Sequence, residues 1–469
     1  MKIQFDEKNL LAGMVGKANG VTSAEMERSR TKALKSLKSF QKLSDEGRYG
    51  FAHLPFRKSV IADIRRYADS VRGGYDTVCV VGIGGSALGA WALDCGIRGP
   101  HPVQGAWTAE RPRLVILDNV DPSFTAAALD SMDPHKTLTV VIAKSGGTAE
   151  TVSTFLIVRD WMERALGSEM AGRIVAVTTE GKGDLFALAQ AERYRTFGIP
   201  ENVGGRFSVL SAVGLVPAAL IGLDVARLIR GAAAMTRLCW LEDLDQNIAL
   251  RAALFHWLVW TRRQKPIQVA FPYSNHLWGT AFWFRQLWAE SLGKARNRKG
   301  ELVNAGQTPV AALGTTDQHS QVQLYIEGPN DKVFTFWAVE KFASPGKIPA
   351  ARFNLPAFDA LAGQSLARLI DAERRATAAA LTENGRPNCT VTLGRVDEEH
   401  LGAFLQMMEF QTAFLGEMLD IDAFDQEGVE LGKRFTYGLM GRKGFEPYRK
   451  QFDDYEKKRG ALGTAAGKR

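Results

Sequence analysis

The chain has little cysteine, and the cysteines it has are not grouped. Its 469 residues include four, Cys79, Cys95, Cys239 and Cys389, with no CxxC pair and no cysteine–histidine spacing typical of zinc sites. Neither a disulfide framework nor a metal centre is therefore predicted. Cys79 lies inside an apolar run and is expected to be a small buried hydrophobic residue.

Long apolar segments are also missing. The first residues, 1–8, contain no hydrophobic stretch of the signal-peptide kind. The most apolar segment, 212–223, is too short to cross a bilayer and contains Pro217. These absences predict a soluble, cytoplasmic protein without a membrane partner.

Charge of one sign is not concentrated in any long stretch. The net charge is +8, but Lys and Arg are dispersed, apart from two short clusters at 448–450 and 457–459. Such clusters are typical of the solvated end of a helix, so no nucleic-acid partner is predicted. A net positive field does favour the capture of a small, doubly charged anion.

What the sequence does have is two buried-looking strands that each run into a turn of small residues. The first turn, 82–86, follows strand 78–81, and the second, 143–148, follows strand 138–142. Glycine lets the backbone approach an anion closely, and the N-terminus of a following helix offers N–H groups. We therefore predict that the two turns grip one phosphate group from two sides.

The first turn also fits a loose dinucleotide-binding pattern, G-x-G-x-x-A, over Gly82 to Ala87. That pattern requires an acidic residue about 20 positions further on, at the end of the next strand. The nearest such residue, Asp118, lies well beyond that spacing. A nicotinamide cofactor is therefore a poor interpretation.

The order of apolar and helical segments predicts two α/β blocks. Continuous Val/Ile/Leu runs separated by helices indicate a parallel sheet covered on both faces, with ligands beyond the carboxyl ends of its strands. In the first block, 46–235, strands are expected at 77–82, 113–118, 137–143 and 173–178. In the second block, 236–415, we expect strands at 265–271 and 332–337 and an aromatic-rich helix at 278–293. Helices at 396–420 and 434–458 are expected to close the chain.

Gln286 and Glu290 stand four residues apart in the aromatic-rich segment, so helical spacing places them on one face. An acid surrounded by Trp and Phe is poorly solvated, which suits it to proton transfer near neutral pH. An amphipathic helix that carries Glu290 on its polar face explains the same spacing equally well.

Three further residues are ambiguous when taken singly. Arg206 follows two glycines, a position that can aim a fixed cation at developing negative charge or form a structural ion pair. His319 lies in a polar, turn-like segment, where a histidine is more often structural than catalytic. Lys433 lies near the end of the chain.

Taken in order along the chain, these segments resemble the phosphoglucose isomerase family, whose members are built from two sugar-isomerase domains. The resemblance covers most of the chain beyond residue 75, and the length is similar to that of the shorter bacterial members. The matching motifs are GIGGSALG (82–89), AKSGGTAET (143–151), GGRFSVLSAVGL (204–215), QLWAESLGK (286–294), GTTDQHS (314–320) and FDQEGVELGK (424–433).

The resemblance implies an α/β fold with two αβα-sandwich sugar-isomerase domains with parallel sheets, at 46–235 and 236–415, plus helical N- and C-terminal segments at 1–45 and 416–469. It implies reversible isomerisation of glucose 6-phosphate and fructose 6-phosphate through a cis-enediolate, as in glycolysis and gluconeogenesis. No metal and no redox cofactor are implied.

The resemblance also implies a role for each matching residue. Glu290 would move the proton between C2 and C1, with Gln286 beside it, and Arg206 would stabilise the enediolate. Lys433 and His319 would serve ring opening, the histidine being supplied by the neighbouring subunit of a homodimer. The residues implied to hold the sugar phosphate are Gly85, Ser86, Lys144, Ser145 and Thr148.

Three positions depart from the family pattern. Ala143 and Gly147 stand where a Ser and a Thr are usual, and Glu427 stands where a Trp or Pro is often found. At about 0.5–1.5 kcal/mol per hydrogen bond, the missing hydroxyls would weaken substrate binding without removing the chemistry.

Two alternatives to a glucose-6-phosphate isomerase remain at this point. One is a non-catalytic, sugar-phosphate-binding regulatory protein, and the other is an isomerase that also acts on mannose 6-phosphate. A regulatory protein has no need of Glu290, Arg206, His319 and Lys433 together, so their joint presence favours an enzyme.

Overall fold

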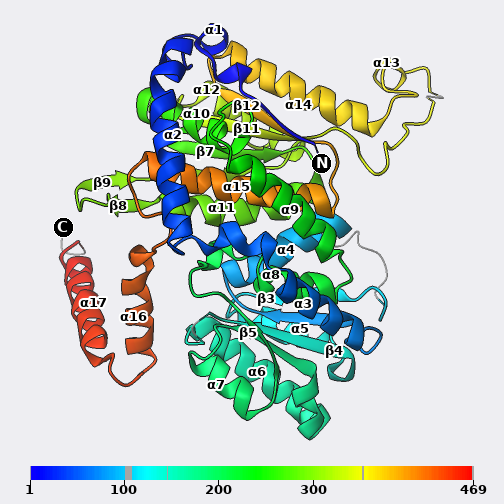
Figure 1. The fold of residues 1–469 in the computed structure, drawn as a ribbon, viewed down its shortest axis with the longest axis vertical. Coiled ribbons are helices and arrows are strands. Elements are labelled where there is room, and N and C mark those ends of the chain that lie inside the picture. Colours follow the sequence, from blue (N-terminus) through cyan, green and yellow to red (C-terminus); the bar gives the residue numbers. More distant parts are fainter. Residues whose placement is uncertain (1, 101–107, 145, 351–352, 467–469) are drawn as a thin grey trace. The chain divides into compact units, whose positions relative to one another are not determined.

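The computed structural model describes residues 2–100, 108–144, 146–350 and 353–466, and the chain divides into two compact units. The described residues of the first unit, Met1–Ala423, form two five-stranded sheets and a two-stranded hairpin (Figure 1). The second unit, Phe424–Arg469, is helical. The predicted α/β class with parallel sheets is confirmed.

The first sheet is parallel throughout and has the strand order β3-β2-β4-β5-β6. Every residue of β2, β4 and β5 is buried, as expected for Val/Ile/Leu runs that are covered on both faces. All four strands predicted for this block form within one residue of their expected bounds. The strands are β2 (Thr77–Val81), β3 (Arg113–Leu117), β4 (Thr137–Ile142), β5 (Ile174–Thr178) and β6 (Arg195–Gly198).

The order of this sheet reverses between β2 and β4. The chain runs from β2 to β3 on one side and then returns to β4 on the other side of β2. The carboxyl ends of β2 and β4 therefore meet at a topological switch point, where ligands usually bind on such sheets. Both small-residue turns leave the sheet here. The helices of this region are α3 (Lys58–Val71), α4 (Gly85–Arg98), α5 (Pro122–Asp130), α6 (Ala149–Leu166), α7 (Asp184–Ala191) and α8 (Ala212–Leu220).

The second sheet has the order β1-β12-β11-β7-β10, and only its edge strand β1 runs antiparallel to its neighbour. Sequence analysis missed β1, which lies in a segment expected to be helical. Four alternating residues are too short a signal, and the strand is fixed by pairing with β12 from the far end of the chain. The strands are β1 (Ile3–Asp6), β7 (Ile267–Pro272), β10 (Thr308–Ala311), β11 (Lys332–Val339) and β12 (Asn388–Leu393).

Helices α9 and α15 cross at two glycines. A Cβ on Gly231 would lie 1.7 Å from the Glu399 carbonyl oxygen, and one on Gly402 would lie 2.0 Å from that of Leu228. The boundaries expected at residues 235 and 415 fall inside these two helices, and the division into two sugar-isomerase domains stays a prediction. The remaining elements of the first unit include α1 (Ala12–Val15), α2 (Ser23–Asp45), α9 (Val225–Cys239), α10 (Ile248–Arg263), α11 (Trp278–Leu292), β8 (Lys294–Arg296), β9 (Leu302–Ala305), α12 (Val322–Glu327), α13 (Pro356–Asp359), α14 (Leu366–Glu383) and α15 (Glu398–Met418).

The second unit consists of helices α16 (Glu430–Leu439) and α17 (Glu446–Ala466). The single helix expected at 434–458 is thus two helices. Their aromatic side chains pair, with the Phe435 and Phe452 ring centroids 5.7 Å apart. Among the residues of this unit whose burial is described, only Gly438 is buried, so the unit has almost no core of its own.

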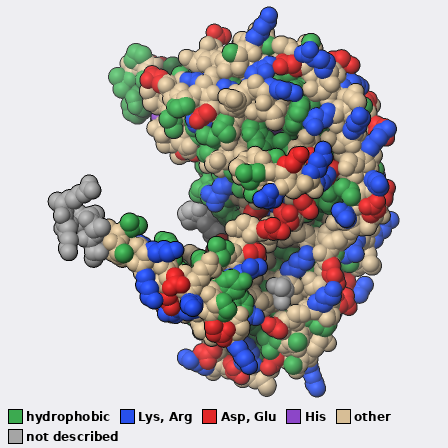
Figure 2. All heavy atoms as spheres, turned by 90° about the vertical axis from the view of Figure 1, so that its left-hand side faces the viewer, with side chains coloured by type: hydrophobic (Ala, Val, Ile, Leu, Met, Phe, Trp, Pro, Cys, Tyr) green, Lys and Arg blue, Asp and Glu red, His purple; other side chains and the backbone are tan. Residues whose placement is uncertain are grey.

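Three expectations about composition can be compared with the structure. All four cysteines are buried and free, and Cys79 is fully buried in β2 as predicted. Within the described ranges, no helix combines the length and apolarity needed to cross a bilayer. Acidic and basic side chains are interspersed over the face that Figure 2 shows, as the dispersed charges of the sequence predicted.

We predict that Gly402→Ala lowers the free energy of unfolding by about 1–3 kcal/mol or more, because the new methyl group forces α9 and α15 apart. Urea denaturation measures this change. The control is Gly13→Ala in α1, where a Cβ meets no atom within 4 Å. Equal stabilities of the two variants would contradict the close crossing.

Candidate active site

Helix α11 carries Gln286 and Glu290 on one face, as their spacing predicted. The Gln286 side chain donates from Nε2 to Glu290 Oε1 at 3.2 Å. The Glu290 side chain is 31% exposed, so it is not enclosed by aromatic rings as the sequence suggested. The reason is helical geometry, because Trp288, two residues before Glu290, is buried on the opposite face of α11. Glu290 therefore lies where a ligand can reach it.

Arg206 is a fixed, buried cation next to this carboxylate. It lies in a short 3-10 turn, Gly205–Phe207, and its side chain is only 1% exposed. Its guanidinium donates from Nε to Ser291 Oγ at 2.8 Å and from Nη1 to Glu290 Oε2 at 3.4 Å. Nη2 donates to the Ala423 carbonyl oxygen at 2.6 Å. The predicted juxtaposition of Arg206 and Glu290 is thus present in the structure.

The first small-residue turn lies against both of these groups. Gly84, with φ of 59°, precedes α4, and a Cβ at this position would lie 2.8 Å from Gln286 Nε2. A Cβ on Gly85 would lie 2.2 Å from the Gly205 carbonyl oxygen. Any larger side chain would displace the turn that carries Arg206. The N-terminus of α4, with Gly85 and Ser86, therefore opens beside Gln286 and Arg206.

The second turn leads into α6, whose N-cap residue is Thr148. The Thr148 hydroxyl makes no capping hydrogen bond to its own helix, which suits a side chain that is to bind an anion. Ser145 lies outside the described residues. Gly146 has a φ of 72°, and a Cβ there would lie 2.4 Å from Leu185 N, so the turn packs closely against α7.

Lys144, which was predicted to bind the phosphate, forms hydrogen bonds to two backbone carbonyl groups. Its Nζ donates to the Glu201 carbonyl oxygen at 2.7 Å and to that of Val203 at 2.9 Å. Desolvation lowers the pKa of Lys144, and the Glu201 carboxylate opposes this shift. The lysine thus ties the second turn to the loop that leads into Arg206.

The remaining two predicted residues are His319 in the first unit and Lys433 in the second unit. His319 is exposed after the 3-10 turn Thr316–Gln318, and its side chain has no hydrogen bond to a described residue. Lys433 lies on α16 in the second unit, where it donates to Glu430 Oε1 at 2.8 Å. Their roles stay predictions.

The family model described as phosphoglucose isomerase matches residues 50–453 of this chain. The chain belongs to the phosphoglucose isomerase family. The matched residues include the helix of Gln286 and Glu290, the Arg206 turn and both small-residue turns.

Individual relatives agree with this assignment. A glucose-6-phosphate isomerase of Carboxydothermus hydrogenoformans is 41% identical over 458 residues, covering 96% of this chain and 97% of the relative. The crystal structure of a hypothetical protein from Thermus thermophilus has a TM-score of 0.83 and 34% identity, and covers 94% of this chain and 100% of that one. A glucose-6-phosphate isomerase structure from Chlamydia trachomatis, 24% identical, shares the fold with a TM-score of 0.74 over 85% of this chain and 76% of that one.

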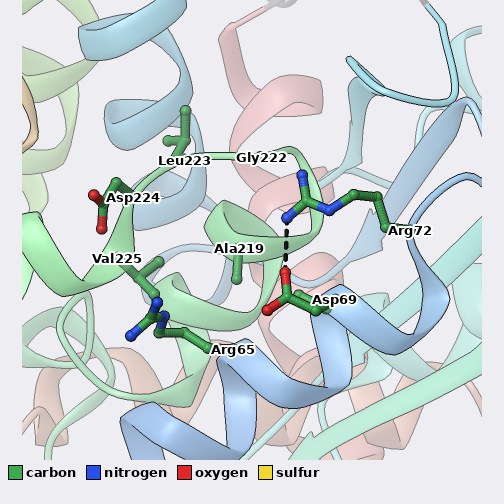
Figure 3. A pocket seen from close by; sticks show the side chains of 9 residues that line it. Arg65, Asp69, Arg72, Ala219, Gly222, Leu223, Asp224 and Val225 are labelled. Atoms are coloured by element: carbon green, nitrogen blue, oxygen red, sulfur yellow. Dashed lines mark hydrogen bonds and ion pairs between the residues drawn. The ribbon is translucent and has the colours of Figure 1, made fainter.

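A separate pocket of the first unit lies between α3 and the start of α9 and has a volume of about 220 Å³ (Figure 3). Its charges are balanced locally. Arg72 pairs with Asp69 at 2.9 Å, and Asp224 accepts from the N–H groups of Ala226 and Arg227 at the start of α9. These helix N–H groups are already occupied, so we assign no anion site there.

Sequence analysis missed two groups that hold Arg206. Ser291 directly follows Glu290 within a matched motif, so its position pointed to the site although its role did not. The role of the Ala423 carbonyl could not be predicted from the sequence, because every residue has a backbone carbonyl group. A candidate metal centre was not expected, and the described residues contain no group of three or more potential metal ligands.

Gly147 stands where the family usually has a threonine, and that threonine can be introduced by mutation. A Cβ there meets no atom within 4 Å, so a threonine fits beside Thr148. We predict that Gly147→Thr lowers KM for fructose 6-phosphate by about 2- to 10-fold through one added hydrogen bond to the phosphate. Gly147→Val has the same shape without the hydroxyl and controls for it. Equal KM values of the two variants would contradict a hydrogen bond from position 147 to the phosphate.

Proposed function

We propose that the protein catalyses the reversible isomerisation of glucose 6-phosphate and fructose 6-phosphate through a cis-enediolate. One observation carries the proposal. The Glu290 carboxylate lies between a buried guanidinium and the Gln286 amide, beside the N-terminus of α4. A carboxylate base, a fixed cation and an anion-binding helix N-terminus are the groups that this reaction requires.

The chemistry divides among these groups. In the aldose-to-ketose direction, Glu290 takes the proton from C2, and the electron pair of that bond forms the C1–C2 double bond. The former carbonyl oxygen on C1 gains negative charge, and Arg206 stabilises this charge. The O2 proton then passes to O1, and Glu290 returns its proton to C1, which completes the ketose.

Gln286 contributes to substrate orientation. Its Oε1 atom is buried and has no hydrogen-bond partner among the described residues. A buried acceptor left unpaired costs free energy, so this oxygen favours a ligand with a hydroxyl donor. The site thus suits a polyhydroxylated substrate with its phosphate at α4 and α6, held by Gly85, Ser86, Ser145 and Thr148.

The proposal includes ring opening by His319 and Lys433 in a homodimer of cytoplasmic location. An exposed histidine without a hydrogen-bonded side-chain partner among the described residues is expected if its partners belong to a second subunit. A C2 dimer would supply the residue twice, once to each site.

We predict that Glu290→Gln lowers kcat about 10²–10⁴-fold and abolishes exchange of the C2 proton with solvent, while sugar phosphate still binds. Coupled assays with fructose 6-phosphate and mannose 6-phosphate, together with NMR in D₂O, measure these changes. Arg285→Gln, on the exposed side of the same helix, should retain activity. Near-normal turnover in the Glu290 variant would contradict its role as the base, whereas a wild-type protein without turnover would favour the regulatory alternative.

The cross-subunit role of His319 has its own test. Neither His319→Ala nor Glu290→Gln homodimers should be active, but mixed dimers would contain one intact site. Co-expression of the two variants should therefore restore about a quarter of wild-type activity in a statistical mixture. If His319 acts within its own chain, mixing restores none.

A further inference from the structure

A buried carboxylate at the end of α15 collects donors from three parts of the first unit. The Glu417 side chain is 2% exposed and forms a bidentate ion pair with Arg298, in which Nη1 lies 2.7 Å from Oε2. The Ser39 hydroxyl donates to Oε2 at 2.8 Å, and the Tyr49 hydroxyl donates to Oε1 at 3.2 Å. This pairing with Glu417 raises the pKa of Arg298.

Arg298 also holds the segment that follows α15. Its backbone N–H donates to the Asp420 carbonyl oxygen at 2.7 Å, and Ile421 N donates to the Gly416 carbonyl oxygen at 3.1 Å. A Cβ on Gly416 would lie 2.8 Å from Ala423 Cβ, which shows that the segment folds closely back onto the helix. Both ends of the segment are therefore fixed on the last turn of α15.

Ala423 at the end of this segment connects it to the candidate site. Its carbonyl oxygen accepts from Arg206 Nη2 at 2.6 Å, the shortest of the bonds described above for that guanidinium. Arg298 itself lies in the β8–β9 hairpin, which directly follows α11 and its Glu290 (Figure 1). Thus Arg298 has no direct contact with Arg206, but it fixes the acceptor that orients it.

On the basis of the proposed isomerisation, we propose that Arg298, with Glu417, is a positioning residue for Arg206. The ion pair fixes Arg298 against α15, and this places its backbone N–H on the Asp420 carbonyl oxygen at the start of segment 420–423. The Ala423 carbonyl at the other end of that segment then aims the guanidinium at the enediolate. We expect this positioning to affect kcat rather than KM, because Arg206 meets full negative charge only when the enediolate forms.

The same helix offers a matched control at its other end. Arg227 is 38% exposed and pairs with Asp397 at 3.0 Å and with Glu398 at 3.1 Å at the start of α15. It therefore also anchors α15 by a guanidinium–carboxylate contact. No hydrogen bond of Arg227 leads to segment 420–423, so its loss removes stability without disturbing Arg206.

We predict that Arg298→Ala and Glu417→Gln lower kcat about 10–100-fold and leave KM for fructose 6-phosphate within about twofold. Affinity for a hydroxamic acid analogue of the enediolate, a planar anion, should fall by a similar factor. Arg227→Ala should lose thermal stability but keep kcat and analogue affinity. Arg298→Lys, which retains the charge, should lie between wild type and Arg298→Ala.

Several outcomes would overturn the inference. They are an unchanged kcat in Arg298→Ala, an equal loss in Arg227→Ala, or a loss of kcat without loss of analogue affinity. If Arg298→Ala does not fold, the milder Glu417→Gln and Arg298→Lys variants decide by the same criteria. A wild-type protein that does not isomerise fructose 6-phosphate would instead overturn the proposed function, so the two failures are distinguishable.

Discussion

The candidate site depends on the burial of one guanidinium. A charge removed from water is tolerated only where hydrogen-bond acceptors replace the lost hydration, and removing a partner of a buried ion costs several kcal/mol. Arg206 meets this requirement with acceptors from Ser291, Glu290 and Ala423. Helix α11 supplies two of them, and the segment that follows α15 supplies the third. Folding therefore cannot bury Arg206 unless both elements are correctly placed.

Sheet topology explains why the two small-residue turns lie at the same place. Neighbouring strands β2 and β4 diverge at the switch point, and each is followed by small residues and then by a helix N-terminus. The α4 helix that begins there also packs on α11. Gly279 allows this, because a Cβ there would lie 2.9 Å from Cys95 Cβ. One helix thus provides the N-terminus proposed to bind the phosphate and supports the helix of the candidate base.

Local patterns revealed much of the fold and part of the site. Continuous apolar runs located four of the five strands of the first sheet, and the spacing of Gln286 and Glu290 placed them on one face. Contacts between distant segments left weaker signals. The pairing of β1 with β12, the attachment of Lys144 to two carbonyl oxygens and the Ala423 acceptor all involve backbone groups, which every residue possesses. Such contacts follow from the assembled fold rather than from residue types.

The hydrogen-bond distances around Arg206 distinguish the two groups that hold the guanidinium firmly from the carboxylate proposed to act on the substrate. Its bonds to Ser291 and Ala423 measure 2.8 and 2.6 Å, whereas Glu290 lies 3.4 Å away. The two shorter bonds have the geometry of strong hydrogen bonds, and the longer contact is weaker. In the proposed mechanism Glu290 takes a proton from the substrate and loses its charge, and the guanidinium then keeps its bonds to Ser291 and Ala423. A hydroxyl and a backbone carbonyl do not change charge, so these two acceptors can hold the cation while the proposed base changes its charge during each turnover.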